Sequence, residues 1–219
     1  LLIAVFLLRD TRPATARQKL RLRDVRMILN NRIFLFYCLI AGFMLIPYQQ
    51  MYTLLSVYAS SYVGLNQFWV GALFAESGII VVLLQFVVSA RVKRYRMTTS
   101  LAVCSLIFAG GFALLTVSTA AFLPFISMVI VTFAEMIWAP AGSALQATLA
   151  PEDKRGRYFG FSGMITSIGY ATGPLFGGLL KDSMNNNVPS MWAVVGAMFI
   201  ICCIGYLILG RIMRDKALT

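Results

Sequence analysis

Residues 68–90 of this chain read FWVGALFAESGIIVVLLQFVVSA, and the basic run RVKRYR follows at 91–96. The first stretch contains a single charged residue, Glu76. A helix of about 20 apolar residues crosses the hydrocarbon core of a bilayer, which is roughly 30 Å thick. The stretch therefore predicts a membrane-spanning helix that ends at a basic loop.

The composition extends this prediction to the whole chain. Of its 219 residues, 59% are hydrophobic and 12% are charged, and the mean hydropathy is +0.80. Soluble domains are about 45–50% apolar and about 25% charged. The apolar residues fall in six blocks of spanning length, which are 33–58, 68–90, 97–117, 122–149, 158–180 and 191–210. The expected fold is an all-α integral membrane protein, a bundle of six transmembrane helices.

The net charge of +11 is distributed asymmetrically between the gaps. Four alternate gaps contain 18 of the 19 basic residues, and the gaps between them contain only Lys181. Basic residues concentrate in cytoplasmic loops of membrane proteins. We therefore expect a multi-pass protein of the cell (inner) membrane with both ends of the chain cytoplasmic. Because the charge follows this pattern, no nucleic acid is expected as a partner. The four basic gaps are 9–32, 91–96, 151–157 and 211–219.

The first 32 residues differ from the rest. Residues 1–8 are apolar but too short to span a bilayer, so they are interpreted as the tail of a preceding helix. Residues 9–32 are expected to form a cytoplasmic central linker, either a short amphipathic surface helix or a solvated segment. Residues 33–219 would form the bundle, and the chain is expected to be part of a larger protein.

The residue types argue against catalysis. The chain contains no histidine, and its four cysteines, Cys38, Cys104, Cys202 and Cys203, lie inside apolar blocks without metal-ligand spacing. Histidine is the commonest general base and the commonest transition-metal ligand. No acid pair has catalytic spacing either. The sequence therefore predicts no enzyme activity, no metal site and no cofactor.

Two acidic residues lie within predicted spans, Glu76 and Glu135. A charged side chain at the bilayer centre costs at least about 2.5–3.5 kcal/mol on insertion scales. None of the predicted spans contains a lysine or arginine that would offset this cost. A buried carboxyl group can instead hold a proton. Both residues are candidates for proton coupling or for binding a cationic substrate; a purely structural acid is the alternative.

Polar side chains also share one face of the first predicted span. Gln49, Tyr52, Thr53 and Ser56 have the spacing i, i+3, i+4 and i+7. This face either lines a substrate cavity or makes hydrogen bonds between helices. Trp138 lies close to Glu135 in the sequence, where an aromatic ring would suit an apolar cation or a packed core alike.

The predicted span 158–180 is rich in glycine. Gly169, Gly173 and Gly177 recur every four residues, which allows another helix to approach closely. Pro174 removes a backbone donor and can kink the helix. This combination suits a moving part, and it also suits static packing.

Three motifs in the sequence resemble motifs of a known protein family. The sequence GYATGPLFGG at 169–178 resembles the antiporter motif of the major facilitator superfamily, whose pseudo-repeat lies on helix 11. The sequence PEDKRGRYFG at 151–160 resembles the family's Arg-Gly loop between helices 10 and 11, and DTRP at 10–13 is similar to the end of helix 6. The resemblance implies that the spans are helices 7 to 12, half of a major facilitator fold, and that a six-helix N-terminal half is missing. The conformational motif would comprise Arg155, Gly156, Gly160, Gly169, Gly173, Pro174, Gly177 and Gly178.

The chain is most similar to the twelve-helix drug:proton antiporters of that superfamily. EMIWAP at 135–140 resembles the Glu-x-x-x-x-Pro of helix 10, where the acid serves a proton or a cationic drug. Gln49 and Gln50 fall where such proteins carry polar residues of helix 7. The loop at 88–96 keeps the family's basic residues but lacks its glycines and aspartate.

The resemblance implies proton-coupled export of small hydrophobic or cationic compounds by alternating access between the two halves. The expected partners are a small-molecule substrate, protons, the lipid bilayer and the missing half. Proton-coupled uptake or exchange of a small metabolite is the alternative, because one fold serves many cargoes in this superfamily.

Overall fold

The computed structural model describes residues 27–185 and 187–217. Within these residues every regular element is a helix. The α-helices are α3 (Arg32–Tyr48), α4 (Leu54–Ser61), α5 (Gln67–Val92), α6 (Met97–Ala113), α7 (Leu123–Leu149), α8 (Arg155–Ser183) and α9 (Val188–Ala217). Short 3₁₀ turns are η2 (Gln49–Met51), η3 (Leu114–Thr116) and η4 (Glu152–Lys154). The predicted helix tail at 1–8 and most of the predicted linker lie outside the described residues.

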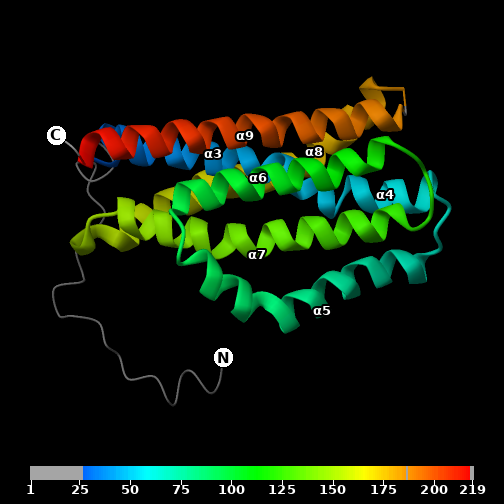
Figure 1. The fold of residues 1–219 in the computed structure, drawn as a ribbon. Coiled ribbons are helices and arrows are strands. Elements are labelled where there is room, and N and C mark those ends of the chain that lie inside the picture. The colour runs from blue at the N-terminus through cyan, green and yellow to red at the C-terminus, as the bar shows by residue number, and fades with distance from the viewer. Residues whose placement is uncertain (1–26, 186, 218–219) are drawn as a thin grey trace, which may run out of the picture.

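The helices run up and down along one axis (Figure 1). Short loops connect neighbouring helices, so successive basic loops gather at one end of the bundle. The loop at 91–96, the turn at Glu152–Lys154 and the end of α9 all lie there, whereas Lys181 lies at the opposite end. The alternation that the charge pattern predicts is therefore present in the arrangement of the helices.

Five helical segments are long and apolar enough to cross a membrane, counting the described residues only. They are Arg32–Ser61, Gln67–Val92, Met97–Thr116, Leu123–Leu149 and Val188–Asp215. The predicted span 158–180 is not among them. Its helix, α8, is 29 residues long, but its many glycine, serine and threonine residues lower its hydropathy. The number of apolar spans found is thus five rather than six, and α8 lies alongside them as a long, less apolar helix (Figure 1).

The centre of the bundle is aromatic. Phe108 of α6 stacks on Phe199 of α9 with ring centroids 4.8 Å apart, and Phe112 stacks on Trp192 at 5.5 Å. All four side chains are fully buried. Offset stacking of this kind adds about 0.5–1.5 kcal/mol for each pair beyond the area buried. These contacts fix α6 between α7 and α9.

Helix α5 has the opposite character. Val82 and Phe86 are 84% and 85% exposed, and most of the helix surface is apolar. A large exposed apolar surface marks contact with a membrane or with another protein. The exposure agrees with a helix at the periphery of a membrane bundle.

The predicted span 33–58 is not one continuous helix. It is broken into α3, η2 and α4 just after Pro47. Pro47 lies in the last turn of α3, where it has no N–H to donate to the carbonyl of Phe43 and its ring crowds the preceding turn. The helix is therefore weakened just before the 3₁₀ turn at Gln49–Met51. The break changes the direction of the side chains that follow, and it sets the geometry of the candidate site.

Candidate functional site

The site is centred on Glu135 in the middle of α7. The Tyr48 hydroxyl donates a hydrogen bond to Glu135 Oε1 at 2.6 Å, and it lies 3.3 Å from the hydroxyl of Tyr52. The Tyr48 ring is 5.3 Å from the Trp138 ring and 6.4 Å from the Tyr170 ring, centroid to centroid. We call these five residues, Glu135, Tyr48, Tyr52, Trp138 and Tyr170, the acid–aromatic cluster.

Four different local structures position this cluster. Tyr48 is the last residue of α3, and Tyr52 follows η2 four residues later, with the two hydroxyls 3.3 Å apart. Glu135 and Trp138 are three residues apart on α7 and therefore share a face. Tyr170 comes from the glycine-rich part of α8. The cluster thus joins three helices that are distant in sequence.

The Glu135 carboxylate has no cationic partner in the part of the chain that the structure describes. It is half-buried and faces aromatic rings. The faces of tyrosine and tryptophan rings attract cations, by about 0.5–2 kcal/mol for each contact. A carboxylate beside such rings therefore offers a site for an organic cation.

A cavity of about 380 Å³ adjoins the cluster between α3, α7 and α8. Trp138 belongs to both the cavity and the cluster. Tyr37 of α3 also lines the cavity, and its hydroxyl donates to the carbonyl of Gly142 at 3.1 Å. The remaining wall combines apolar residues such as Phe159 with a few polar ones, which are Ser143, Gln146, Ser162 and Thr166. This is the size and lining expected of a small-molecule site.

Pro140 leaves a carbonyl of α7 without its helical donor, because a proline at i cannot bond to the carbonyl at i−4. That carbonyl belongs to Met136, and Gln85 Nε2 of α5 donates to it at 3.3 Å. A polar side chain of α5 therefore acts as a hydrogen-bond donor to α7 next to Glu135.

Of the predicted cavity residues, Gln50 has another role. Its side chain is fully buried, and its amide donates to the carbonyls of Ile46 at 2.8 Å and Gly173 at 2.9 Å. The assignment of Gln50 to the substrate cavity stays a prediction; in the structure its two hydrogen bonds connect α3 to α8. Thr53 donates to Gln50 Oε1 at 3.1 Å and so belongs to the same contact.

The other residues of the predicted stripe separate at the break. Tyr52 is 44% exposed and belongs to the acid–aromatic cluster. Ser56 lies on α4 and donates to the carbonyl of Tyr52 at 2.8 Å. Gln49 is half-buried, and its Cβ lies against Gly173. The uniform face predicted by helical spacing is lost because the helix does not continue through Gln49–Met51.

Three glycines of the conformational motif lie where α8 touches α3. A Cβ at Gly169 would collide with the carbonyl oxygen of Gly42, and one at Gly173 would collide with Gln49. At Gly177 it would collide with Gln50 Oε1. The four-residue spacing therefore marks a close helix contact.

The remaining motif residues lie elsewhere. A Cβ at Gly156, Gly160 or Gly178 would meet no atom within 4 Å among the described residues. Arg155 forms an exposed ion pair with Glu152 at 3.3 Å at the start of α8. Pro174 lies inside α8 between two of the close-contact glycines. The structure thus divides the motif into a packed part and an open part.

Glu76 lies apart from the cluster. It is half-buried on α5, and its Oε2 atom is buried without a hydrogen-bond partner in the described structure. Two residues away, Phe74 stacks on Tyr52 with ring centroids 5.8 Å apart. Glu76 is therefore near the cluster but makes no hydrogen bond to it among the described residues.

Sequence reasoning missed Tyr48, Tyr170 and Tyr37. Tyr48 is four residues before Tyr52, so extending the polar stripe by one turn would have included it. Its hydrogen bond to Glu135 joins residues 87 positions apart, and no spacing rule predicts that contact.

The fold and the site together define a multi-pass membrane protein with an acid inside the bundle. A family model described as Major Facilitator Superfamily matches residues 125–217. The chain is 32% identical over 139 residues to the uncharacterized MFS-type transporter YttB of Bacillus subtilis (strain 168), which covers 63% of this chain and 35% of that protein. It is 26% identical over 170 residues to a Na(+), Li(+), K(+)/H(+) antiporter of Planococcus maritimus, which covers 71% of this chain and 40% of that protein.

These matches support the resemblance of the chain to the major facilitator superfamily of membrane transporters. Members of this superfamily are transporters and not enzymes, which agrees with the class of protein expected from the sequence. The finer resemblance to drug:proton antiporters stays a prediction. The chain spans less than half the length of the curated relatives that it matches.

Proposed function

We propose that the transporter containing this chain exchanges protons for small organic cations, and that Glu135 carries each in turn. The observation behind the proposal is the Glu135 carboxylate itself. It is half-buried at the middle of α7, has no cationic partner among the described residues, and is hydrogen-bonded to Tyr48 beside a cavity. A proton and a cation would compete for the same two oxygens.

Tyr48 gives Glu135 a suitable partner in both states. When the carboxylate is ionised, the Tyr48 hydroxyl donates to it at 2.6 Å. When the carboxyl is protonated, its O–H can donate to Tyr48, which then donates to the Tyr52 hydroxyl 3.3 Å away. A hydroxyl group can reverse its role because it is both donor and acceptor. Neither state leaves the carboxyl unpaired.

The aromatic rings favour an organic cation over a bare metal ion. Tyr48, which donates a hydrogen bond to the acid, also contacts the rings of Trp138 and Tyr170. Cation–π attraction and apolar contact both reward a delocalised cation, whereas hard metal ions prefer several oxygen ligands.

A second candidate is exchange of alkali cations for protons. The Planococcus maritimus relative is described as a Na(+), Li(+), K(+)/H(+) antiporter. In this chain the oxygens of Glu135, Tyr48 and Tyr52 are the nearest equivalent of an oxygen ligand set. This candidate predicts proton release on addition of Na⁺ or K⁺ alone.

Substituting Glu135 tests the proposal. The transporter is reconstituted in vesicles, and active export of an ethidium-like monocation is measured between pH 6 and pH 8. Glu135→Gln, which keeps the shape but cannot titrate, is expected to abolish export driven by a proton gradient. Glu152→Gln is the matched control, because the Glu152 side chain is 89% exposed at a helix end. Equal rates with the same pH dependence for wild type and Glu135→Gln would contradict the proposal and leave Glu76 as the candidate.

We further propose that the basic end of the bundle faces the cytoplasm and that the protein lies in the cell (inner) membrane. The proposal rests on the distribution of charge. Cysteine introduced in place of Asp153 should react with an impermeant reagent only from inside the cell, and cysteine in place of Asp182 only from outside. Both aspartates are exposed and lie at opposite ends of the bundle. The reverse labelling pattern would overturn the orientation.

A further inference from the structure

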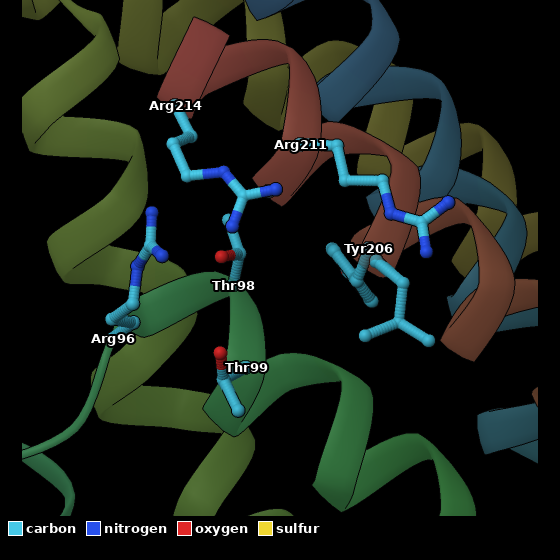
Figure 2. A pocket seen from close by; sticks show the side chains of 8 residues that line it. Arg96, Thr98, Thr99, Tyr206, Arg211 and Arg214 are labelled. Carbon is cyan, nitrogen blue, oxygen red and sulfur yellow. The ribbon is translucent and has the colours of Figure 1, made fainter. Parts of the chain in front are cut away.

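A second cavity lies at the basic end of the bundle, far along the helices from Glu135. Its volume is about 280 Å³, and it is formed between the start of α6 and the end of α9 (Figure 2). Its lining residues come only from these two helices and the residue before α6. The lining includes Arg96, Thr98, Gly210 and Arg214.

The cavity is strongly positive. The side chain of Arg96, just before α6, and that of Arg214, on α9, extend over it, and Arg211 lies at its edge beside Tyr206 (Figure 2). None of the three arginines forms an ion pair with any residue that the structure describes. Guanidinium groups that converge without a carboxylate favour binding of an anion.

The start of α6 adds to this potential. Arg96 precedes the first residue of α6, no side chain caps the helix, and its first turn has no acidic residue. The first N–H groups of a helix are unsatisfied and carry a partial positive charge, which stabilises phosphate groups.

Thr98 is an independent sign that a ligand binds there. It is only 7% exposed, and its hydroxyl is directed into the gap between Arg96 and Arg214 (Figure 2). The hydroxyl forms no hydrogen bond with any residue that the structure describes, and the residue lines the cavity.

Gly210 keeps the space in front of that hydroxyl open. A Cβ at Gly210 would lie 2.8 Å from Thr98 Oγ1, so any other residue would press on the hydroxyl. The absence of a side chain at Gly210 therefore allows α9 to lie close to α6 beside Arg96 and Arg214.

The cavity is at the level where the apolar part of the helices ends. Leu207, which lines it, is 50% exposed, and Ile204 and Val103 below it are 52% and 45% exposed. A ligand in the cavity therefore has an apolar surface beneath it and basic groups around it. This is the distribution of chemistry in a phospholipid, whose phosphate lies at the interface above its acyl chains.

We infer that this cavity binds the phosphodiester headgroup of an anionic phospholipid, which links α6 to α9 at the membrane surface. Arg96 and Arg214 hold the phosphate oxygens, Thr98 donates its hydroxyl to one of them, and the acyl chains lie along Leu207 and Ile204. Basic pockets between transmembrane helices bind such headgroups in general. The inference does not depend on the transported substrate.

The test measures lipid binding by native mass spectrometry of the delipidated transporter with phosphatidylglycerol, phosphatidylcholine or inorganic phosphate. Wild type should bind phosphatidylglycerol in preference to phosphatidylcholine. The double variant Arg96→Gln/Arg214→Gln should bind phosphatidylglycerol about 30-fold more weakly. The matched control Arg91→Gln/Arg94→Gln removes two charges of the same loop outside this cavity and should bind as wild type does.

A second variant separates the site from general charge. Thr98→Val keeps the shape and the net charge but removes the hydroxyl, and it should weaken phosphatidylglycerol binding about threefold to tenfold. Equal loss in the two double variants, with no effect of Thr98→Val, would overturn the inference. Displacement of phosphatidylglycerol by millimolar inorganic phosphate would also overturn it, because a free anion would then be the ligand.

Discussion

The chain where α3 ends, at residues 48–50, has two sides with opposite properties. On one face, Gln49 and Gln50 press against Gly173 and Gly177 of α8, and no room for another atom remains. On the other face, Tyr48 reaches Glu135 of α7 beside a cavity of about 380 Å³. Of three consecutive residues, Gln49 and Gln50 are therefore tightly packed against α8, whereas Tyr48 belongs to the open polar site. Close packing of α3 on α8 makes the two helices one unit, so a movement of α8 would be transmitted to Tyr48.

The largest effect is expected from filling the packed face. In Gly173→Leu the added side chain would collide with Gln49 and force α8 away from α3. Overpacking of this kind costs about 1–3 kcal/mol. We expect transport to be lost while the protein still inserts in the membrane. Transport in vesicles and membrane content would be measured together.

The control for this variant is Gly178→Leu on the same helix. A Cβ at Gly178 meets nothing within 4 Å among the described residues, so transport should be retained. Wild-type activity of Gly173→Leu would show that the glycine strip is not needed for close contact.

An intermediate effect is expected on the open face. Tyr48→Phe keeps the ring but removes the donor to Glu135, and a hydrogen bond to a charged group contributes about 1.5–3 kcal/mol. Affinity for a monovalent organic cation should fall by roughly tenfold or more. Tyr170→Phe is the control, because Tyr170 contacts the Tyr48 ring but forms no hydrogen bond with Glu135 in the described structure. Equal affinities for the two variants would show that ring contacts alone hold the cation.

The smallest effect is expected from Gln50→Met, which keeps the volume but removes both amide hydrogen bonds. The Gly173 carbonyl would lose its 2.9 Å partner, so stability should fall by about 1–3 kcal/mol. Thermal unfolding in detergent would measure this loss, and the pH dependence of transport should stay unchanged. Gln49→Met is the comparison, since the Gln49 side chain makes no hydrogen bond to a described residue. If Gln50→Met shifts the pH profile but not the stability, Gln50 belongs to the polar site.

Several features were predictable from the sequence because they depend on local order. Hydropathy predicted helical spans at 68–90 and 122–149, and α5 and α7 are found there. The four-residue period of Gly169, Gly173 and Gly177 predicted a close helix contact, which the structure contains. Hydropathy also predicted an apolar span at 158–180, but α8 is less apolar than the other long helices. The small residues that allow close packing, such as glycine and serine, are also weakly hydrophobic.

The sequence alone determined the membrane class, the alternation of basic loops and the presence of an acid in the middle of a span, since composition and spacing within one helix are sufficient for these. Only the tertiary structure decided that Tyr48 meets Glu135, that Gln50 bonds to Gly173, and that Thr98 faces Gly210 between two arginines. The members of each pair lie on different helices. Helical periodicity fixes which residues share a face, but the partner of that face depends on how all the helices pack, including the break after Pro47.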